Sequence, residues 1–105
     1  MTADPKAHEA TTRDLQAERA SALARATERL EAALREFAEA DAGFAERPTE
    51  RRRVARQEAL AFAGERLWFL VIQREALGLS RHDVVYEVLE VPAAVRAAMG
   101  PVRAR

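Results

Sequence analysis

Six consecutive apolar residues, from Leu67 to Ile72, constrain the fold of this chain more than any other feature. The run reads Leu-Trp-Phe-Leu-Val-Ile and lies between Arg66 and Gln73. On an α-helix, successive side chains of such a run point in every direction, and a helix that is apolar all round is buried on several sides. A single partner helix does not cover it. We therefore expect this segment at the centre of a core that other helices, a second subunit or both complete.

The length and charge of the chain exclude several classes of protein. Its 105 residues are the size of one ordinary domain. The 17 basic and 17 acidic residues cancel, so the chain lacks the general electrostatic attraction of a nucleic-acid or anionic-membrane binder. It has no cysteine, which is compatible with a reducing cytoplasm. It shows neither a secretory signal nor the run of about 20 apolar residues that a membrane span needs. We expect a cytoplasmic protein that contacts no membrane.

Glycine and proline positions predict an all-α fold. Both are rare, with four residues each, and they lie almost entirely where helices should begin or end. We expect a disordered tail over residues 1–10 and a single helical domain over 11–105. Gly43 and Gly78 are the predicted stops of two long helices, and Ser80 is the predicted cap of the third. The four predicted helices span about 12–42, 49–77, 81–90 and 92–99.

The first long helix carries two apolar rows at seven-residue spacing. The rows are Leu23, Leu30, Phe37 and Phe44, with large side chains, and Ala26, Ala33 and Ala40, with small ones. Such rows are typical of a coiled-coil seam that lets a partner helix approach closely. A short loop at Pro48 should make the two long helices, which are nearly equal in predicted length, an antiparallel hairpin. We attribute Gly64 to tight contact with the alanine row, and expect the two short helices to fold back over the apolar run.

Several large side chains would be poorly covered in a lone hairpin, namely Phe37, Phe44, Leu60 and Phe62. We therefore expect a second copy to complete a four-helix homodimer, in preference to a monomer. The predicted core and interface residues are Leu23, Leu30, Phe37, Phe44, Phe62, Leu67, Trp68, Phe69, Val71 and Ile72.

A set of short motifs lies along roughly residues 15–102. The motifs are Glu18-Arg19-Ala20-Ser21-Ala22-Leu23, Trp68 with the apolar residues after it, Gln73-Arg74-Glu75-Ala76, Gly78-Leu79, Val91-Pro92, Val95 and Met99-Gly100. Together they resemble a family of small uncharacterised bacterial all-helical proteins. Because the motifs consist mostly of structural residue types, the resemblance implies the helical fold and assigns no activity and no functional residue.

A basic cluster near the start of the second long helix is the main candidate for a charged partner surface. It consists of Arg47, Arg51, Arg52, Arg53 and Arg56. These arginines are able to neutralise phosphates, but the positive end of a helix dipole disfavours them there. The acidic residues expected opposite them across the turn are Glu36, Glu39, Asp41 and Glu46. Mutual neutralisation is the preferred interpretation, because no aromatic residue is interleaved with the arginines to stack bases.

The remaining polar residues give no pattern typical of catalysis. Arg74 and Glu75 are expected to form a partly buried pair with Glu18 or Arg19. His82 is expected on the surface, and the only other histidine lies in the predicted tail, so we predict no metal site. No serine has a base at recognisable spacing. We predict no catalytic residue, no cofactor and no metal.

The C-terminal segment from Tyr86 to Val95 has the outline of a helix-turn-helix motif. The turn position where glycine is common holds Glu90, and we therefore expect a lid over the core, not a DNA reader. A small-molecule pocket beside Trp68 stays open as a possibility. The sequence predicts a non-enzymatic helical interaction or scaffold module, and the alternative is a nucleic-acid-associated factor that uses the basic cluster.

Overall fold

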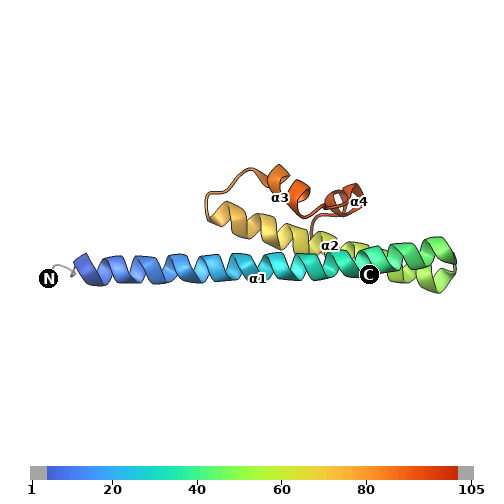
Figure 1. Ribbon diagram of the computed structural model, residues 1–105, viewed down its shortest axis with the longest axis horizontal. Helices are drawn as coiled ribbons and strands as arrows, with labels where there is room; N and C mark the ends of the chain where they lie inside the picture. The colour runs from blue at the N-terminus through green and yellow to red at the C-terminus, as the bar shows by residue number, and fades with distance from the viewer. Residues whose placement is uncertain (1–4, 102–105) are drawn as a thin grey trace.

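The computed structural model describes residues 5–101, which form four α-helices and no strand. The helices are α1 (Pro5–Glu46), α2 (Glu50–Ala76), α3 (His82–Val88) and α4 (Ala93–Ala97). The two long helices form an antiparallel hairpin, and α2 lies between α1 and the two short C-terminal helices (Figure 1). The predicted all-α hairpin with short helices folded back over it is confirmed.

The seam between α1 and α2 uses the two rows that the seven-residue spacing predicts. The buried residues of α1 are Ala26, Leu30, Ala33 and Phe37. Leu23 and Phe44, farther along the row of large side chains, are half-buried. The small side chains of the alanine row let α2 approach closely, as in a coiled coil. The hairpin is therefore held by apolar contact along one face of α1.

The first helix is longer than predicted at both ends. It begins at Pro5, so the expected disordered tail over 1–10 is wrong for residues 5–10, while residues 1–4 lie outside the described part. Proline fits a first helical turn because its missing N–H needs no partner there. Gly43 does not stop the helix, which runs to Glu46, because glycine lowers helix propensity by only about 1 kcal/mol. With 42 residues against 27, the two long helices are not equal in length.

The ends of α2 follow from local capping signals. The Thr49 hydroxyl accepts a hydrogen bond from the Arg52 backbone N–H at 3.2 Å, which satisfies one of the free amides of the first turn. After the last turn, Gly78 adopts a φ of +80°, and the Leu79 N–H donates to the Arg74 carbonyl at 2.9 Å. A left-handed glycine with this bond is the usual end of a helix.

The two short helices are shorter than the predicted ranges 81–90 and 92–99. The N-cap of α3 is Arg81, without a side-chain hydrogen bond, so the predicted cap by Ser80 is wrong. The chain leaves α3 through Glu90, whose φ of 52° lies in the left-handed region. This turn lets the Val91 N–H donate to the Tyr86 carbonyl at 2.9 Å and directs the chain back along α2.

The core lies where α1, α2 and the C-terminal helices meet. Its fully buried large side chains are Leu30, Leu67, Leu70 and Val95. Leu67, Leu70 and Val71 show that half of the apolar run is buried, whereas Trp68 is half-buried and Phe69 and Ile72 are 39% and 42% exposed. The chain thus covers two sides of the run, and the third side of α2 is open to solvent.

Gly64 brings the C-terminal segment close to α2. A Cβ atom built on this residue would lie 2.3 Å from the carbonyl oxygen of Ala98, and the Gly100 N–H donates to the Gly64 carbonyl at 3.4 Å. The glycine is needed for tight contact, as predicted, but the contact is with the end of α4 and not with the alanine row of α1.

The molecule is elongated. Its radius of gyration is 18.3 Å, against about 13 Å for a compact domain of 100 residues. The cause is α1, whose residues 5–21 are all exposed and extend beyond the end of α2 (Figure 1).

Substituting two helical glycines separates propensity from packing. Gly64→Ala should lower the free energy of unfolding by about 1–3 kcal/mol, because the new methyl group overlaps backbone atoms of Ala98 that yield only by shifting the chain. Gly43→Ala is the matched control. Nothing lies within 4 Å of its Cβ position, so it should raise stability by about 0.5–1 kcal/mol. Chemical denaturation measures both, and a stabilised Gly64→Ala variant would contradict the packing.

Candidate interaction surfaces

The open side of α2 carries the most prominent exposed apolar surface on the long helices. Phe62, Phe69 and Ile72 are 36%, 39% and 42% exposed. Their spacing of seven and three residues places them near one another along the helix. The Trp68 ring contacts that of Phe69 at 5.2 Å between centroids, which extends the surface toward the C-terminal helices. We call the side of α2 that carries Phe62 and Phe69 the open face.

Arg66 lies across the two rings of the open face. Its guanidinium is 4.8 Å from the Phe62 centroid and 5.8 Å from that of Phe69. Attraction between a cation and the ring faces holds it there. In the described part of the chain its Nε–H is buried without a hydrogen-bond partner. A buried donor without a partner costs about 1–3 kcal/mol, and this N–H is able to donate a hydrogen bond to a carboxylate or carbonyl oxygen.

The predicted core and interface residues separate into three groups by exposure. Leu30, Phe37, Leu67 and Val71 are buried. Leu23, Phe44 and Trp68 are half-buried. Those exposed are Phe62, Phe69 and Ile72. The hairpin alone therefore covers Phe37, which was expected to need a second copy, and leaves Phe62 open as expected.

Three arginines of the basic cluster are engaged within the hairpin. Arg56 forms an ion pair with Asp41 at 2.6 Å and lies over the Phe37 ring at 5.3 Å. Arg52 donates to the Gly43 carbonyl at 2.8 Å. Both contacts join α2 to the end of α1. The expected neutralisation across the hairpin thus occurs through Asp41, while Arg52 instead binds a carbonyl at the negative end of the α1 dipole.

The third engaged arginine pairs along its own helix. Arg53 donates two hydrogen bonds to the carboxylate of Glu50 in the first turn of α2. The hydrogen bond from Arg53 lowers the pKa of the Glu50 carboxyl, and the same bond raises the pKa of Arg53. Both groups are exposed, and a pair in this setting adds little to stability.

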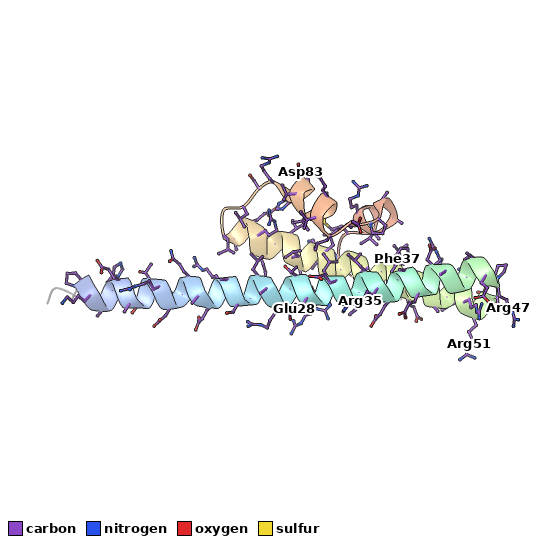
Figure 2. The ribbon with its side chains drawn as sticks, in the orientation of Figure 1. Glu28, Arg35, Phe37, Arg47, Arg51 and Asp83 are labelled. Carbon is purple, nitrogen blue, oxygen red and sulfur yellow. The ribbon has the colours of Figure 1, made fainter. Side chains whose placement is uncertain are left out.

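Arg47 and Arg51 remain available at the tip of the hairpin. Figure 2 shows both at the end where the two long helices join, with Arg51 directed away from them. Among residues 5–101, no acidic group lies within ion-pair distance of either side chain. Of the five arginines in the basic cluster, only these two are therefore free to bind phosphate without giving up a partner in the hairpin.

The polar residues after the apolar run contact the C-terminal segment, not α1. Arg74 donates to the Arg81 carbonyl at 3.2 Å, and Glu75 lies 3.2 Å from His82 Nε2. The predicted pair with Glu18 or Arg19 is therefore wrong. The prediction of a solvated His82 is wrong too, because only 18% of its side chain is exposed. These contacts attach the start of α3 to the end of α2.

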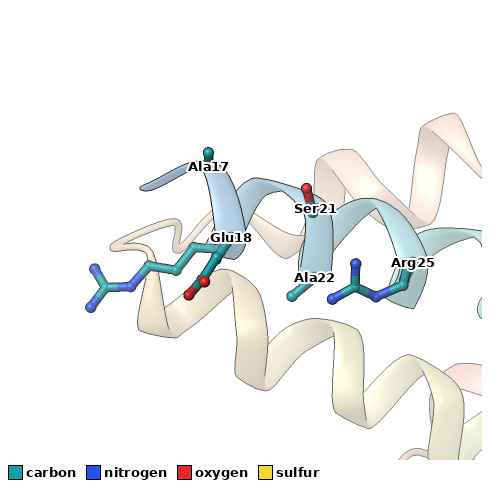
Figure 3. Close-up of a pocket in the computed structure, with 6 residues that line it drawn as sticks. Ala17, Glu18, Ser21, Ala22 and Arg25 are labelled. Carbon is teal, nitrogen blue, oxygen red and sulfur yellow. The ribbon is translucent and has the colours of Figure 1, made fainter. Parts of the chain in front are cut away.

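A shallow, open hollow lies on α1 beside the end of α2. Figure 3 shows Glu18, Ala22 and Arg25 directed into the space between the two helices. The lining residues are Ala17, Glu18, Arg19, Ser21, Ala22 and Arg25. No lining side chain is buried, so the hollow lacks the enclosed polar groups that fix the orientation of a small ligand.

The short helices act as a cover over α2. Val85, Val91 and Val95 belong to the buried core, whereas Val84 and Val88 of α3 are 41% and 72% exposed. Periodicity alone did not separate these valines, because α3 has only seven residues. Residues 5–10, which were expected in a tail, instead form the exposed first turns of α1.

Residues 5–101 contain neither a candidate metal site nor a candidate membrane span. They contain no group of three or more histidine or acidic side chains placed to hold a metal ion. None of the described helices combines the length and the apolar character needed to cross a bilayer. Comparisons with models of protein families, with curated proteins and with solved structures found no match to the chain.

The basic cluster leads to a test with a matched control. Arg56→Gln removes the ion pair with Asp41 and the contact with the Phe37 ring, and should lower the free energy of unfolding by about 0.5–2 kcal/mol. High salt should reduce the loss, because ions screen the ion pair. Arg51→Gln, on the same helix, should change stability by less than about 0.5 kcal/mol. Equal losses for the two variants in denaturant titrations would contradict these assignments.

Proposed function

We propose that the protein is a non-enzymatic helical interaction module that works as a homodimer. The open face of α2 carries this proposal. Single exposed apolar residues are common on protein surfaces, but large ones that are neighbours on one side of a helix are typical of an interaction site. Amphipathic helices bind partners through such rows of side chains.

The charge of the chain favours a second copy over a strongly charged partner. With 17 basic and 17 acidic residues, two copies do not repel one another at long range. The basic cluster supports the nucleic-acid alternative less well than the sequence suggested. Arg52, Arg53 and Arg56 already bind groups of the hairpin, and a phosphate would have to replace those partners.

The mass in solution tests the proposal. A homodimer should have twice the 11.7 kDa of the chain, or about 23 kDa, in light scattering at tens of micromolar. An interface built on apolar side chains should persist from low to physiological salt, since salt does not weaken apolar burial. A monomer under these conditions would contradict self-association. Nucleic-acid binding that weakens steeply over the same salt range would favour the alternative.

A further inference from the structure

We infer that α3 is a lid that opens by itself, while the hairpin and α4 stay in place, and that its opening widens the apolar surface of α2. The motion takes place within one chain, so it goes beyond the proposed self-association and does not depend on it. Three features of the C-terminal segment point to such a lid: the attachment of α3, the two turns that flank it and the side chain that it covers.

The two short helices are attached to α2 in different ways. The attachment of α4 is close apolar packing, since Val95 is fully buried and the backbone of Ala98 occupies the space beside Gly64. In α3 only Val85 is buried, and the other side chains are half-buried or exposed. A helix of seven residues is not stable alone in water. The fold of α3 therefore depends on few apolar contacts.

The remaining attachment of α3 is polar and incompletely satisfied. At the end of α2, Arg74 donates to the Arg81 carbonyl at 3.2 Å, and Glu75 lies 3.2 Å from His82 Nε2. Within residues 5–101, Nε of Arg74 and Nδ1 of His82 are buried without a hydrogen-bond partner. A buried polar atom without a partner destabilises the state that buries it. Opening of α3 gives both atoms access to water, which offsets part of the lost contact.

The turns on both sides of α3 are suited to act as hinges. Gly78 has a φ of +80°, and nothing lies within 4 Å of its Cβ position. Glu90 has a φ of 52°, and the hydrogen bond from the Val91 N–H to the Tyr86 carbonyl accompanies it. A non-glycine residue adopts this conformation at a cost in free energy, which the release of α3 removes. The Arg96 guanidinium of α4 lies 5.6 Å from the Tyr86 ring, but this contact is at an exposed residue and therefore weak.

The side chain that α3 covers lies beside the open face. Val71 is 8% exposed and precedes Glu75 by one turn, so both are on the side of α2 that α3 approaches (Figure 1). Trp68 lies three residues before Val71, and its ring contacts that of Phe69 on the open face. Opening of α3 therefore joins Val71 to these two rings in one apolar surface. The lid sets how much apolar surface α2 presents to solvent or to a partner.

Thiol labelling tests the opening, because the chain has no cysteine of its own. Val71→Cys should react with a small thiol reagent at least about tenfold faster than Val95→Cys, since only the first position is uncovered when α3 opens. The two changes are chemically equal and both valines are buried, one beside α3 and the other in α4. Equal rates for the two variants would overturn the separate opening of α3.

Removal of the His82 side chain distinguishes opening from residual exposure of the closed state. Adding His82→Ala to Val71→Cys should raise its labelling rate at least about threefold, because the contact with Glu75 is lost. Glu87→Ala, at an exposed position of the same helix, is the matched control and should leave the rate unchanged. The rate of Val95→Cys should not respond to His82→Ala. A Val71→Cys rate that does not change, or equal increases at both cysteines, would overturn the lid.

Amide hydrogen exchange tests the same motion in the unmodified chain. The N–H groups of Leu89 and Ala98 follow α3 and α4, and each donates at 3.0 Å to the carbonyl four residues earlier. After correction for intrinsic rates, Leu89 should exchange at least about tenfold faster than Ala98. Its rate should also respond less to low concentrations of denaturant, because local opening exposes less surface than unfolding. Equal rates with equal responses would show that α3 and α4 open together, which contradicts the inference.

Discussion

Burial of Leu67 and Leu70 joins the parts of this fold. Both side chains are almost fully covered, by α1 on one side of α2 and by the C-terminal segment on another. The second cover depends on Gly64, since the Ala98 carbonyl occupies the space where any other residue would place its Cβ atom. With two sides of α2 covered in this way, its third side is exposed to solvent. The exposed positions of Phe69 and Ile72 follow from the number of helices that one short chain supplies.

Local signals in the sequence predicted the hairpin well. The capping hydroxyl of Thr49 and the left-handed conformation of Gly78 depend on residues within one turn of each helix end, and the seven-residue rows identify the face of α1 that meets α2. The same reasoning failed at Gly43 and Ser80. Gly43 lies within a helix that the surrounding residues favour strongly enough to continue, and α3 begins without the hydroxyl cap that Ser80 offers.

Which distant segment a residue contacts was harder to predict than which side of its helix is buried. Periodicity shows that Gly64 or Arg74 points toward a neighbour, but the identity of that neighbour depends on how the C-terminal segment folds back. Both residues contact that segment, at Ala98 and Arg81, where the sequence suggested α1. The basic cluster shows the same limit. The turn places Arg56 beside Asp41 as expected, whereas Arg53 finds an acidic partner in its own first turn, at Glu50.

The exposed part of α1 and the open face of α2 differ in what their exposure means. Within the exposed segment 5–21 the row of large side chains continues with Gln16 and Glu9, and the alanine row with Arg19 and Thr12. These residues do not build a coiled-coil seam. The hairpin ends where its apolar seam ends, and the helix beyond that point depends on the intrinsic propensity of its alanines and charged residues. The open face of α2 carries phenyl rings instead, and the exposure of their apolar surface to water is unfavourable in free energy. Exposed phenyl rings, those of Phe62 and Phe69, therefore lie on α2 outside the seam that α1 covers.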